Sequence, residues 1–589
     1  MGLPLALQAH RDGNLEVAEQ HYKRALEQQV RDPILFQNYG ALLRGQGRVD
    51  TAAAIYEQGT RLFPAHAGIL ANQANLLAAK SPASALALTL AAVRLQLAQG
   101  VPPEKLRGAL ISAIAKLREL QLCHWALALV QEALLRLGPD PHLLLQMLLL
   151  LELRAEQSEP ALAIPGNTGK VVRLIEQQLE QCDPLEQAEI RLGLASHRLG
   201  QADVEGALAN YERGMAVLRS PESVSLEERV KRQKLVDINS WNFGCTLLKH
   251  QDLQRGWQLF EYGLRTPAEG KQRWQRALRK PFSASDLPLW RGESLAGQRL
   301  LLLEEQAIGD VMMFLTLVPT LLQEAESIGL LLGDRLLSIY RRSLEALGLG
   351  KRLQIWGYAD AQQGKLSPAS FTLQCPIGSI CQHRFTAAEA YGLHLPLLKA
   401  KSTRVEQFRA DYRSHGPPVE RLIGISWRGG GKGARIKQKS ITPEQFAQLL
   451  QPIPGVRFVS LQYGNAVPAV EEWRKQGLDV IHDPRVDPLK QMDLWLAQVA
   501  ACDAVLSVAN TTIHGAGGLG LPTQCLLSIH SDWRWFDDPA VTRSYWYPSV
   551  GILREHRQRA WDDAMLQART WLEQGCPMPV GPVCTAPAP

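Results

Sequence analysis

A spacing of 34 residues recurs at the start of the chain. Three residue types return at this interval: Gly13, Ala18 and Tyr22 reappear as Gly47, Ala52 and Tyr56. This period is typical of helix-turn-helix repeats, in which each repeat buries its apolar face against its neighbours. Small residues let paired helices approach closely, and the tyrosines fill the groove left by the next helix. The spacing therefore predicts a helical solenoid.

The helical pattern continues beyond these two repeats without a clean period. It runs through 70–99, 104–137 and 140–155, and after a loop at 160–168 it resumes at 188–200 and 204–218. A last helical pair follows over 230–265, and a polar, basic, proline-containing linker occupies 266–298. We therefore predict tetratricopeptide-type repeats over 1–265, irregular in the middle.

From Arg299 onward, short apolar runs alternate with amphipathic helices. The predicted strands are 300–303, 327–332, 422–427, 457–461, 480–482, 504–508 and 523–528. Strands that alternate with helices predict parallel α/β sheets, whose ligands bind at the carboxyl ends of the strands.

Composition excludes several classes of protein. The 589 residues are 46% hydrophobic and 21% charged, as in folded domains rather than disordered chains. The net charge of +6, with 58 acidic residues, is too small and too mixed for a nucleic-acid binder. The longest apolar run, 143–151, is too short for a membrane span, and no basic n-region opens the chain, so we expect a cytoplasmic protein. The nine cysteines form no C-x-x-C pair, so we expect buried thiols and no metal site.

Three strand-to-helix turns carry polar residues suited to chemistry. In the first, the apolar run 300–303 leads through Gly309 to Asp310, in the first turn of a helix. The helix dipole favours a carboxylate there, and glycine permits a tight turn. A capping aspartate without a catalytic role is the alternative.

The second turn is a glycine-rich basic loop that follows the strand ending near Trp427. It contains Arg428, glycines at 429–431, Lys432, Lys439 and Ser440. Glycines let the backbone approach a diphosphate closely, and lysine or arginine neutralises it without a metal. The spacing is not that of a P-loop, and glycine-rich loops also occur without phosphate.

The third turn joins the apolar strand 504–508 to a helix of small residues. Asn510, Thr511 and Thr512 lie at the start of that helix, where free N–H groups, the dipole and two hydroxyls can bind an anion. An ordinary capped helix that packs closely through glycines is the alternative, and His514 alone could equally be a partly buried histidine.

Taken in order, these turns resemble those of bacterial tetratricopeptide-repeat (TPR) proteins with a C-terminal GT-B glycosyltransferase domain, related to heptosyltransferases and O-linked N-acetylglucosamine transferase. The resemblance covers nearly the whole chain. It includes Gly256-Trp257, Glu305-Gln306 with Gly309-Asp310, Lys439-Ser440, Ser460-Leu461-Gln462, Ser507-Val508 with His514, Asp532-Trp533-Arg534-Trp535 and Trp546-Tyr547-Pro548.

The resemblance implies an α-helical TPR solenoid followed by an α/β GT-B-like domain of two Rossmann-like lobes. The N-terminal lobe, 299–405, would lie on the acceptor side and the C-terminal lobe, 406–575, on the nucleotide-sugar side, before a proline-rich tail at 576–589. It further implies metal-independent, cofactor-free transfer from a nucleotide-diphosphate sugar to a protein or glycan acceptor selected by the repeats.

Residue roles follow from the same resemblance. Asp310 falls at the position of the general base of the heptosyltransferases. Six residues fall in donor-binding segments: Lys439, Ser440, Gln462, Thr511, Thr512 and His514. We expect the diphosphate between the loop 427–440 and the helix that begins near Asn510, which also places Trp427, Arg428 and Lys432 at the donor.

The chain departs from the family pattern at three places. Ala509-Asn510 stands where the family often has Asp-Thr after Ser-Val, and Ala307 stands where glycine is usual. The N-terminal lobe is also short for a six-stranded half. A catalytically inactive scaffold whose repeats bind protein partners is therefore the alternative to an active hexosyl- or heptosyltransferase.

Overall fold

We used a computed structural model of the chain, which describes residues 2–78, 80–120, 122–157, 166–221, 224–265, 276, 281–391, 396–430, 434–536, 540–557 and 560–580. The chain forms two compact units, 1–197 and 198–589. No helix of the described residues is both long and apolar enough to cross a bilayer. The predicted site residue Lys432 lies outside the described residues, as do 266–275 and 277–280 of the predicted linker.

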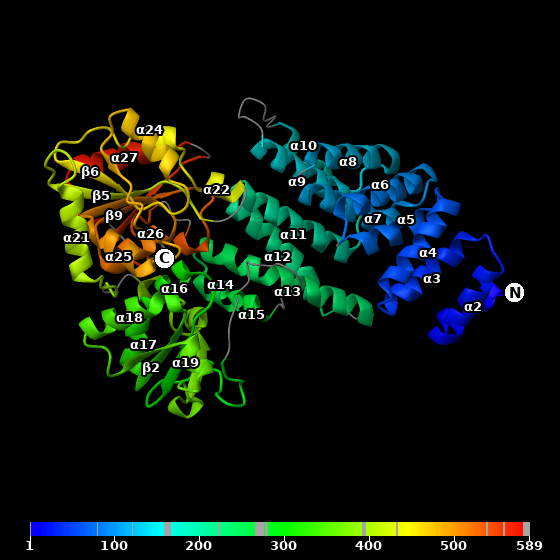
Figure 1. Ribbon diagram of the computed structural model, residues 1–589, viewed down its shortest axis with the longest axis horizontal. Coiled ribbons are helices and arrows are strands. Elements are labelled where there is room, and N and C mark those ends of the chain that lie inside the picture. The colour runs from blue at the N-terminus through cyan, green and yellow to red at the C-terminus, as the bar shows by residue number, and fades with distance from the viewer. Residues whose placement is uncertain are drawn as a thin grey trace. The chain divides into compact units, whose positions relative to one another are not determined.

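The first unit consists of helices, drawn from blue to cyan in Figure 1. They are α1 (Gly2–Arg11), α2 (Leu15–Glu27), α3 (Pro33–Gly45), α4 (Val49–Leu62), α5 (Ala67–Leu77), α6 (Pro82–Ala98), α7 (Pro103–Glu119), α8 (Cys123–Leu137), α9 (Pro141–Gln157), α10 (Gly166–Leu179) and α11 (Pro184–Gly200). No strand occurs among the described residues before Arg299. The predicted helical character of the irregular middle is therefore confirmed.

The residues that repeat every 34 positions are buried where helices pair. Tyr22 and Tyr56 are both fully buried. A Cβ atom on Gly40 would lie 2.3 Å from Cε1 of Tyr56, so only glycine lets this ring lie against α3. Gly13 and Gly47 have φ values of +75° and +76°, in the left-handed region that glycine adopts without strain, and they turn the chain between helices. The 34-residue period therefore reflects two features: a buried tyrosine that packs on a small residue, and a glycine that turns the chain between helices.

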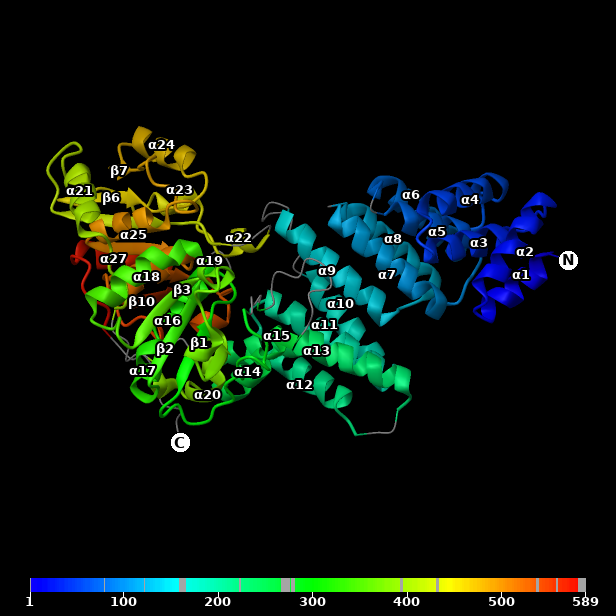
Figure 2. The ribbon, with the colours of Figure 1, turned by 60° about the horizontal axis from the view of Figure 1, so that its bottom comes forward.

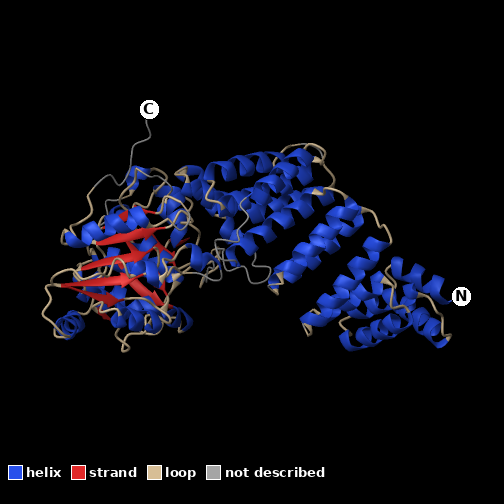
Figure 3. Cartoon of the chain, turned by 90° about the horizontal axis from the view of Figure 1, so that it is seen from above, coloured by secondary structure: helices blue, strands red, loops and turns tan. Residues whose placement is uncertain are grey.

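The second unit begins with further helices: α12 (Val204–Leu218), α13 (Leu226–Lys249), α14 (Leu253–Phe260) and α15 (Tyr262–Arg265). Tyr211 of α12 is fully buried and stacks on Phe243 of α13, with ring centroids 5.3 Å apart. The pattern of the first repeats therefore recurs here. Figure 3 shows that the strands gather in the other part of this unit.

The N-terminal lobe is a four-stranded parallel sheet with helices. Its elements are β1 (Arg299–Leu303), α16 (Ile308–Leu315), α17 (Val318–Glu324), β2 (Ser327–Leu332), α18 (Asp334–Ala346), β3 (Leu353–Gly357), α19 (Tyr358–Gln362), β4 (Leu373–Pro376) and α20 (Ile380–Arg384). The strand order is β3-β2-β1-β4, with Leu301 paired to Gly329 and Gln374 (Figure 2). A four-stranded sheet fits a lobe too short for six strands.

The C-terminal lobe is a six-stranded parallel sheet in the order β10-β9-β8-β5-β6-β7. Its elements are α21 (Ser402–Arg413), β5 (Arg421–Ser426), α22 (Ala434–Gln438), α23 (Pro443–Phe446), β6 (Val456–Ser460), α24 (Val467–Lys475), β7 (Val480–Ile481), α25 (Met492–Ala501), β8 (Ala504–Val508), α26 (Thr511–Leu519), β9 (Thr523–Leu527), the 3-10 turn η5 (Trp533–Trp535), β10 (Val550–Arg554) and α27 (Asp562–Glu573). Counted along the chain this is the doubly wound order 3-2-1-4-5-6.

Helix α21 belongs to the C-terminal lobe. It begins at Ser402, before the boundary expected at 405, and Arg409 donates to the carbonyl oxygens of Ala500 and Ala501 beside β8. Tyr412 donates to Asp483 at 2.9 Å. The lobe therefore starts a few residues earlier than the sequence indicates.

With both sheets parallel and helix-covered, the fold is a helical repeat region followed by a two-lobed GT-B-like α/β domain.

Candidate active site

The strand order of each sheet reverses at one point. In the N-terminal lobe β2 and β4 lie on opposite sides of β1, and in the C-terminal lobe β6 and β8 lie on opposite sides of β5. Open α/β sheets bind ligands in the crevice outside the carboxyl ends of the strands at such a switch point. The loops after β1, β5 and β8 border these two points. Together with the first turns of the helices that follow them, these loops carry every described site residue that the sequence predicts except Gln462, which follows β6.

Asp310 links the two lobes. It is 4% exposed and lies in the first turn of α16, where its Oδ2 accepts a hydrogen bond from the Ala307 amide at 3.1 Å. Its Oδ1 accepts a hydrogen bond from Nε of Arg534, which lies in η5 of the C-terminal lobe. Asp310 therefore caps its helix with one oxygen and faces the other lobe with the second.

The contact continues into a line of alternating charges. Arg534 and Lys439 both bind Oδ2 of Asp532, at 3.1 Å and 3.0 Å. We call Asp310, Arg534, Asp532 and Lys439 the ion chain. Burial opposes the charged form of Asp532, but Arg534 and Lys439 hold the pKa of this carboxyl well below its usual range. All four groups thus face partners of opposite charge.

The loops after β5 and β8 meet at the carboxyl ends of these two neighbouring strands. Asn510 caps α26, since its Oδ1 accepts from the Thr512 amide at 2.8 Å. Its Nδ2 donates to Oγ of Ser426 at 2.7 Å and to the Arg428 carbonyl at 3.0 Å. Oγ of Ser440 accepts from the Gly429 amide at 2.9 Å and so ties the far end of the loop back to its start. Lys439 and the Asn510 turn therefore both lie at the carboxyl ends of the strands.

Two predicted donor residues of this region, Gln462 and Trp427, are buried. Oε1 of Gln462 accepts from the amides of Trp427 and Arg428, at 3.1 Å and 2.9 Å, and from Ser426. The Trp427 ring is 5% exposed and packs on Trp473, with ring centroids 4.6 Å apart. Trp427 continues the inward alternation of Ile423 and Ile425 along β5, and this places its ring in the lobe's core rather than at the crevice. The prediction of a donor contact through this side chain is corrected accordingly.

The remaining predicted residues differ in exposure. Arg428 is exposed and Thr511 is half-buried, whereas Thr512 and His514 are buried. Nδ1 of His514 lies 3.1 Å from the Tyr547 hydroxyl. A Cβ atom on Gly309 would lie 2.9 Å from Cδ2 of His514, so the N-terminal turns of α16 and α26 touch. Burial lowers the pKa of His514 to about 4, although the Asp310 charge opposes this, so the ring is neutral at pH 7.

Sequence reasoning assigned no role to three residues of this crevice: Arg534, Asp532 and Gln306. The Asp532-Trp533-Arg534-Trp535 motif was visible in the sequence, but nothing local indicates that Arg534 pairs with Asp310. Gln306 has a φ of +61° although it is not glycine, and Oε1 accepts weakly from Arg534 at 3.5 Å. No sequence signal marks this strained position.

The last helical pair reaches both lobes through an aromatic cluster. Trp533 packs edge-on against Trp257 and Phe260 of α14, at 5.5 Å and 5.0 Å between ring centroids, and stacks on Phe314 of α16 at 6.1 Å. Beside this cluster the fully buried side chains of Arg276 and Glu305 form an ion pair, which also includes Glu261 of the helical region. The helices of this unit and the β1 switch point are therefore held together.

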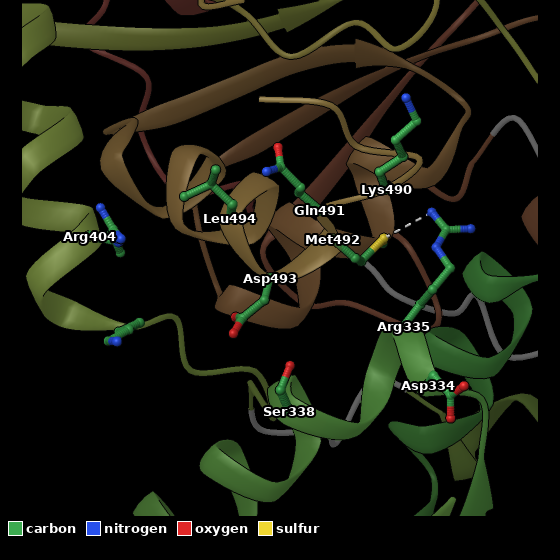
Figure 4. A pocket seen from close by; sticks show the side chains of 10 residues that line it. Asp334, Arg335, Ser338, Arg404, Lys490, Gln491, Met492, Asp493 and Leu494 are labelled. Carbon is green, nitrogen blue, oxygen red and sulfur yellow. Dashed lines mark hydrogen bonds between the residues drawn. The ribbon is translucent and has the colours of Figure 1, made fainter. Parts of the chain in front are cut away.

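A cavity of about 430 Å³ lies at the starts of α18 and α25 and near the start of α21. Figure 4 shows its lining, in which Arg335 contacts the sulfur of Met492. The other lining residues are Asp334, Ser338, Lys401, Arg404, Lys490, Gln491, Asp493 and Leu494. No described residue of the predicted site and no residue of the ion chain lines it. The cavity is therefore separate from the crevice at the switch points.

The chain is similar in part to several known proteins. No protein-family model matches the chain. Protein FlbA of Caulobacter vibrioides is 25% identical over 403 residues, which is 64% of this chain and 59% of FlbA, so the match spans less than two thirds of that relative. A solved glycosyl transferase family 9 structure from Veillonella parvula is 12% identical and covers 49% of this chain and 94% of its own, with a TM-score of 0.31. A tetratricopeptide repeat protein from Parabacteroides merdae is 18% identical and covers 40% of this chain and 96% of its own, with a TM-score of 0.23. Scores this low carry no argument about substrate or residue roles.

Proposed function

We propose that the chain is a glycosyltransferase that moves a sugar from a nucleotide-diphosphate sugar to a protein or glycan acceptor. One observation carries most of this proposal. Asp310, at the switch point of the N-terminal sheet, pairs with Arg534, and Arg534 and Lys439 both bind Asp532 beside the switch point of the C-terminal sheet. A carboxylate opposite cations is the arrangement that deprotonation of a hydroxyl and departure of a diphosphate both require.

In the proposed reaction Asp310 is the general base. An oxygen of its carboxylate takes the proton of the acceptor hydroxyl, and the hydroxyl oxygen forms a bond to the anomeric carbon of the sugar. The bond between that carbon and the diphosphate oxygen breaks, and its electron pair leaves with the diphosphate. Lys439 and the positive end of the α26 dipole neutralise the charge that develops there, so the transfer uses neither a metal nor a cofactor.

The geometry of the loop after β5 supports the donor site. Its start is held by Gln462 and Asn510 and its end by Ser440, so both described ends of the loop are anchored before a ligand arrives. Anchored groups lose little conformational entropy on binding. Arg428 is exposed next to this anchored backbone and is available to the donor. The helical repeats would select the acceptor, since stacked repeats present extended binding surfaces.

A specific observation favours a second candidate, a scaffold without catalytic activity. Every charge of the ion chain already has a partner of opposite sign. Such a line of pairs between lobes could simply hold them together, while the repeats bind protein partners. In this candidate Asp310 is a cap and a lobe contact, and nucleotides have no site.

Nucleotide binding separates the two candidates. We would record melting curves with UDP, GDP, ADP and dTDP for the wild type, for Lys439→Ala and for Lys475→Ala. Lys475 is the control lysine, because it is 75% exposed and pairs with Glu472 within α24. Binding at 100 times the dissociation constant adds ~2.7 kcal/mol of stability. A shift with at least one nucleotide that Lys439→Ala reduces and Lys475→Ala retains supports a transferase. No shift with any of the four supports the scaffold.

A further inference from the structure

We propose that the ion chain opens when a diphosphate binds. The diphosphate displaces Asp532 from Lys439 and Arg534, so that Arg534 becomes a second cation for the diphosphate and releases Asp310. This inference rests on the proposed donor site and adds its regulation: without donor, the general base stays paired with Arg534.

The first argument is the geometry at Asp532. One oxygen of this carboxylate, Oδ2, binds both cations, at 3.0 Å from Nζ of Lys439 and 3.1 Å from Nη1 of Arg534. The two cations therefore converge on one point. A diphosphate places several anionic oxygens at such a point and carries more charge than a carboxylate, so it competes for both cations at once.

The second argument is a pair of buried polar atoms that lie near the ion chain and have no hydrogen-bond partner among the described residues. Nε2 of Gln306 and Nε2 of His530 are both buried and have no hydrogen-bond partner within the described part of the chain. Gln306 touches Arg534, and Lys439 is among the charges that act on His530. Buried polar atoms are rarely left unpaired in folded proteins. An amide nitrogen can only donate, so Gln306 points to an acceptor such as a phosphate oxygen.

The third argument is backbone strain at two residues near the ion chain, one in each lobe. Gln306 in the N-terminal lobe has a φ of +61°, and Phe536 in the C-terminal lobe has a φ of +44°. Neither is glycine, and residues held in this region gather at ligand sites and switches. The Arg534 guanidinium lies 4.4 Å from the centre of the Trp533 ring, which is fixed in the aromatic cluster. The arginine can therefore change its partner while the turn that carries it stays in place.

Asp532→Asn tests this inference with inorganic pyrophosphate as the probe. Asparagine keeps an acceptor for the Arg534 amide, which Oδ1 of Asp532 now binds at 3.3 Å, but removes the competing charge. Calorimetry should show pyrophosphate binding about tenfold to hundredfold tighter than in the wild type. Asp479→Asn is the matched control. Asp479 pairs with the buried Arg457 just before β7, at the opposite end of the strands, and its replacement should leave pyrophosphate affinity unchanged.

Each possible result of this experiment either supports or overturns the inference. Equal or weaker pyrophosphate binding by folded Asp532→Asn overturns the inference, as does the absence of pyrophosphate binding in both proteins. If Asp532→Asn does not fold, Asp532→Ser, which can also cap the turn, is measured in its place. Tighter pyrophosphate binding with no response to any nucleoside diphosphate supports the opening of the ion chain and removes the donor proposal. A nucleoside diphosphate that binds the wild type and Asp532→Asn equally supports the donor site and overturns the opening.

Discussion

Replacing His514 by glutamine should flatten the acid side of the stability curve. His514 is 6% exposed, and burial lowers its pKa to about 4 from an ordinary 6.5. Between these two values the unfolded chain binds a proton that the folded chain does not, so stability falls as the pH falls through this window. The difference of the two pKa values corresponds to roughly 3 kcal/mol at 1.36 kcal/mol per unit. Asp310 and Asp532 oppose this loss, and Arg534 adds to it.

Urea unfolding at pH 7, 6, 5 and 4 measures this effect. Glutamine can still bond the Tyr547 hydroxyl but cannot titrate, so Asp310 and Arg534 keep a neutral neighbour at every pH. The free energy of unfolding of His514→Gln should therefore fall less between pH 7 and pH 4 than that of the wild type, by roughly 3 kcal/mol. His556→Gln is the control, since His556 is 64% exposed and should leave the curve unchanged. Identical curves for His514→Gln and the wild type would refute the reasoning.

Three further outcomes are expected. Arg276→Met should destabilise the second unit by about 3–5 kcal/mol in chemical denaturation, because it leaves Glu305 buried without its cation; little change would contradict this role. Gly40→Ala should lower the melting temperature through a clash with Tyr56 that costs about 1–3 kcal/mol, whereas Gly45→Ala on the same helix, with open space around it, should not. Lys439→Ala should weaken nucleotide-sugar binding by about 1–3 kcal/mol in calorimetry, and unchanged affinity would remove Lys439 from the site.

The sequence predicted the strands of the sheet interiors and missed most of the edges. The three unpredicted strands, β3, β4 and β10, are all edge strands. In β3 and β4 the apolar run is short or interrupted by a glutamine, so its signal is weaker. β3 exposes Gln354, and β4 is a four-residue strand that ends in Pro376. The 34-residue spacing was a stronger signal, because it records a glycine turn and a buried tyrosine in both of the first two repeats.

At the site, contacts between residues close in sequence could be predicted, whereas contacts between distant residues could not. Asn510 and Asp310 could be predicted because capping depends on the next few residues. The ring of Trp427 could also have been assigned to the core, since it follows Ile423 and Ile425 with the period of a strand. The pair of Asp310 with Arg534 could not, because 224 residues separate them and only the packing of two lobes brings them together.

The most direct test of the proposed reaction is single-turnover sugar transfer by Asp310→Asn, once the donor and acceptor are known. Asparagine can still cap α16, so folding and nucleotide binding should be preserved. Loss of the general base should cut turnover by roughly 10²–10⁴-fold. If Asp310→Asn transfers sugar at nearly the wild-type rate, Asp310 is only a cap and a lobe contact, and the proposed mechanism is wrong.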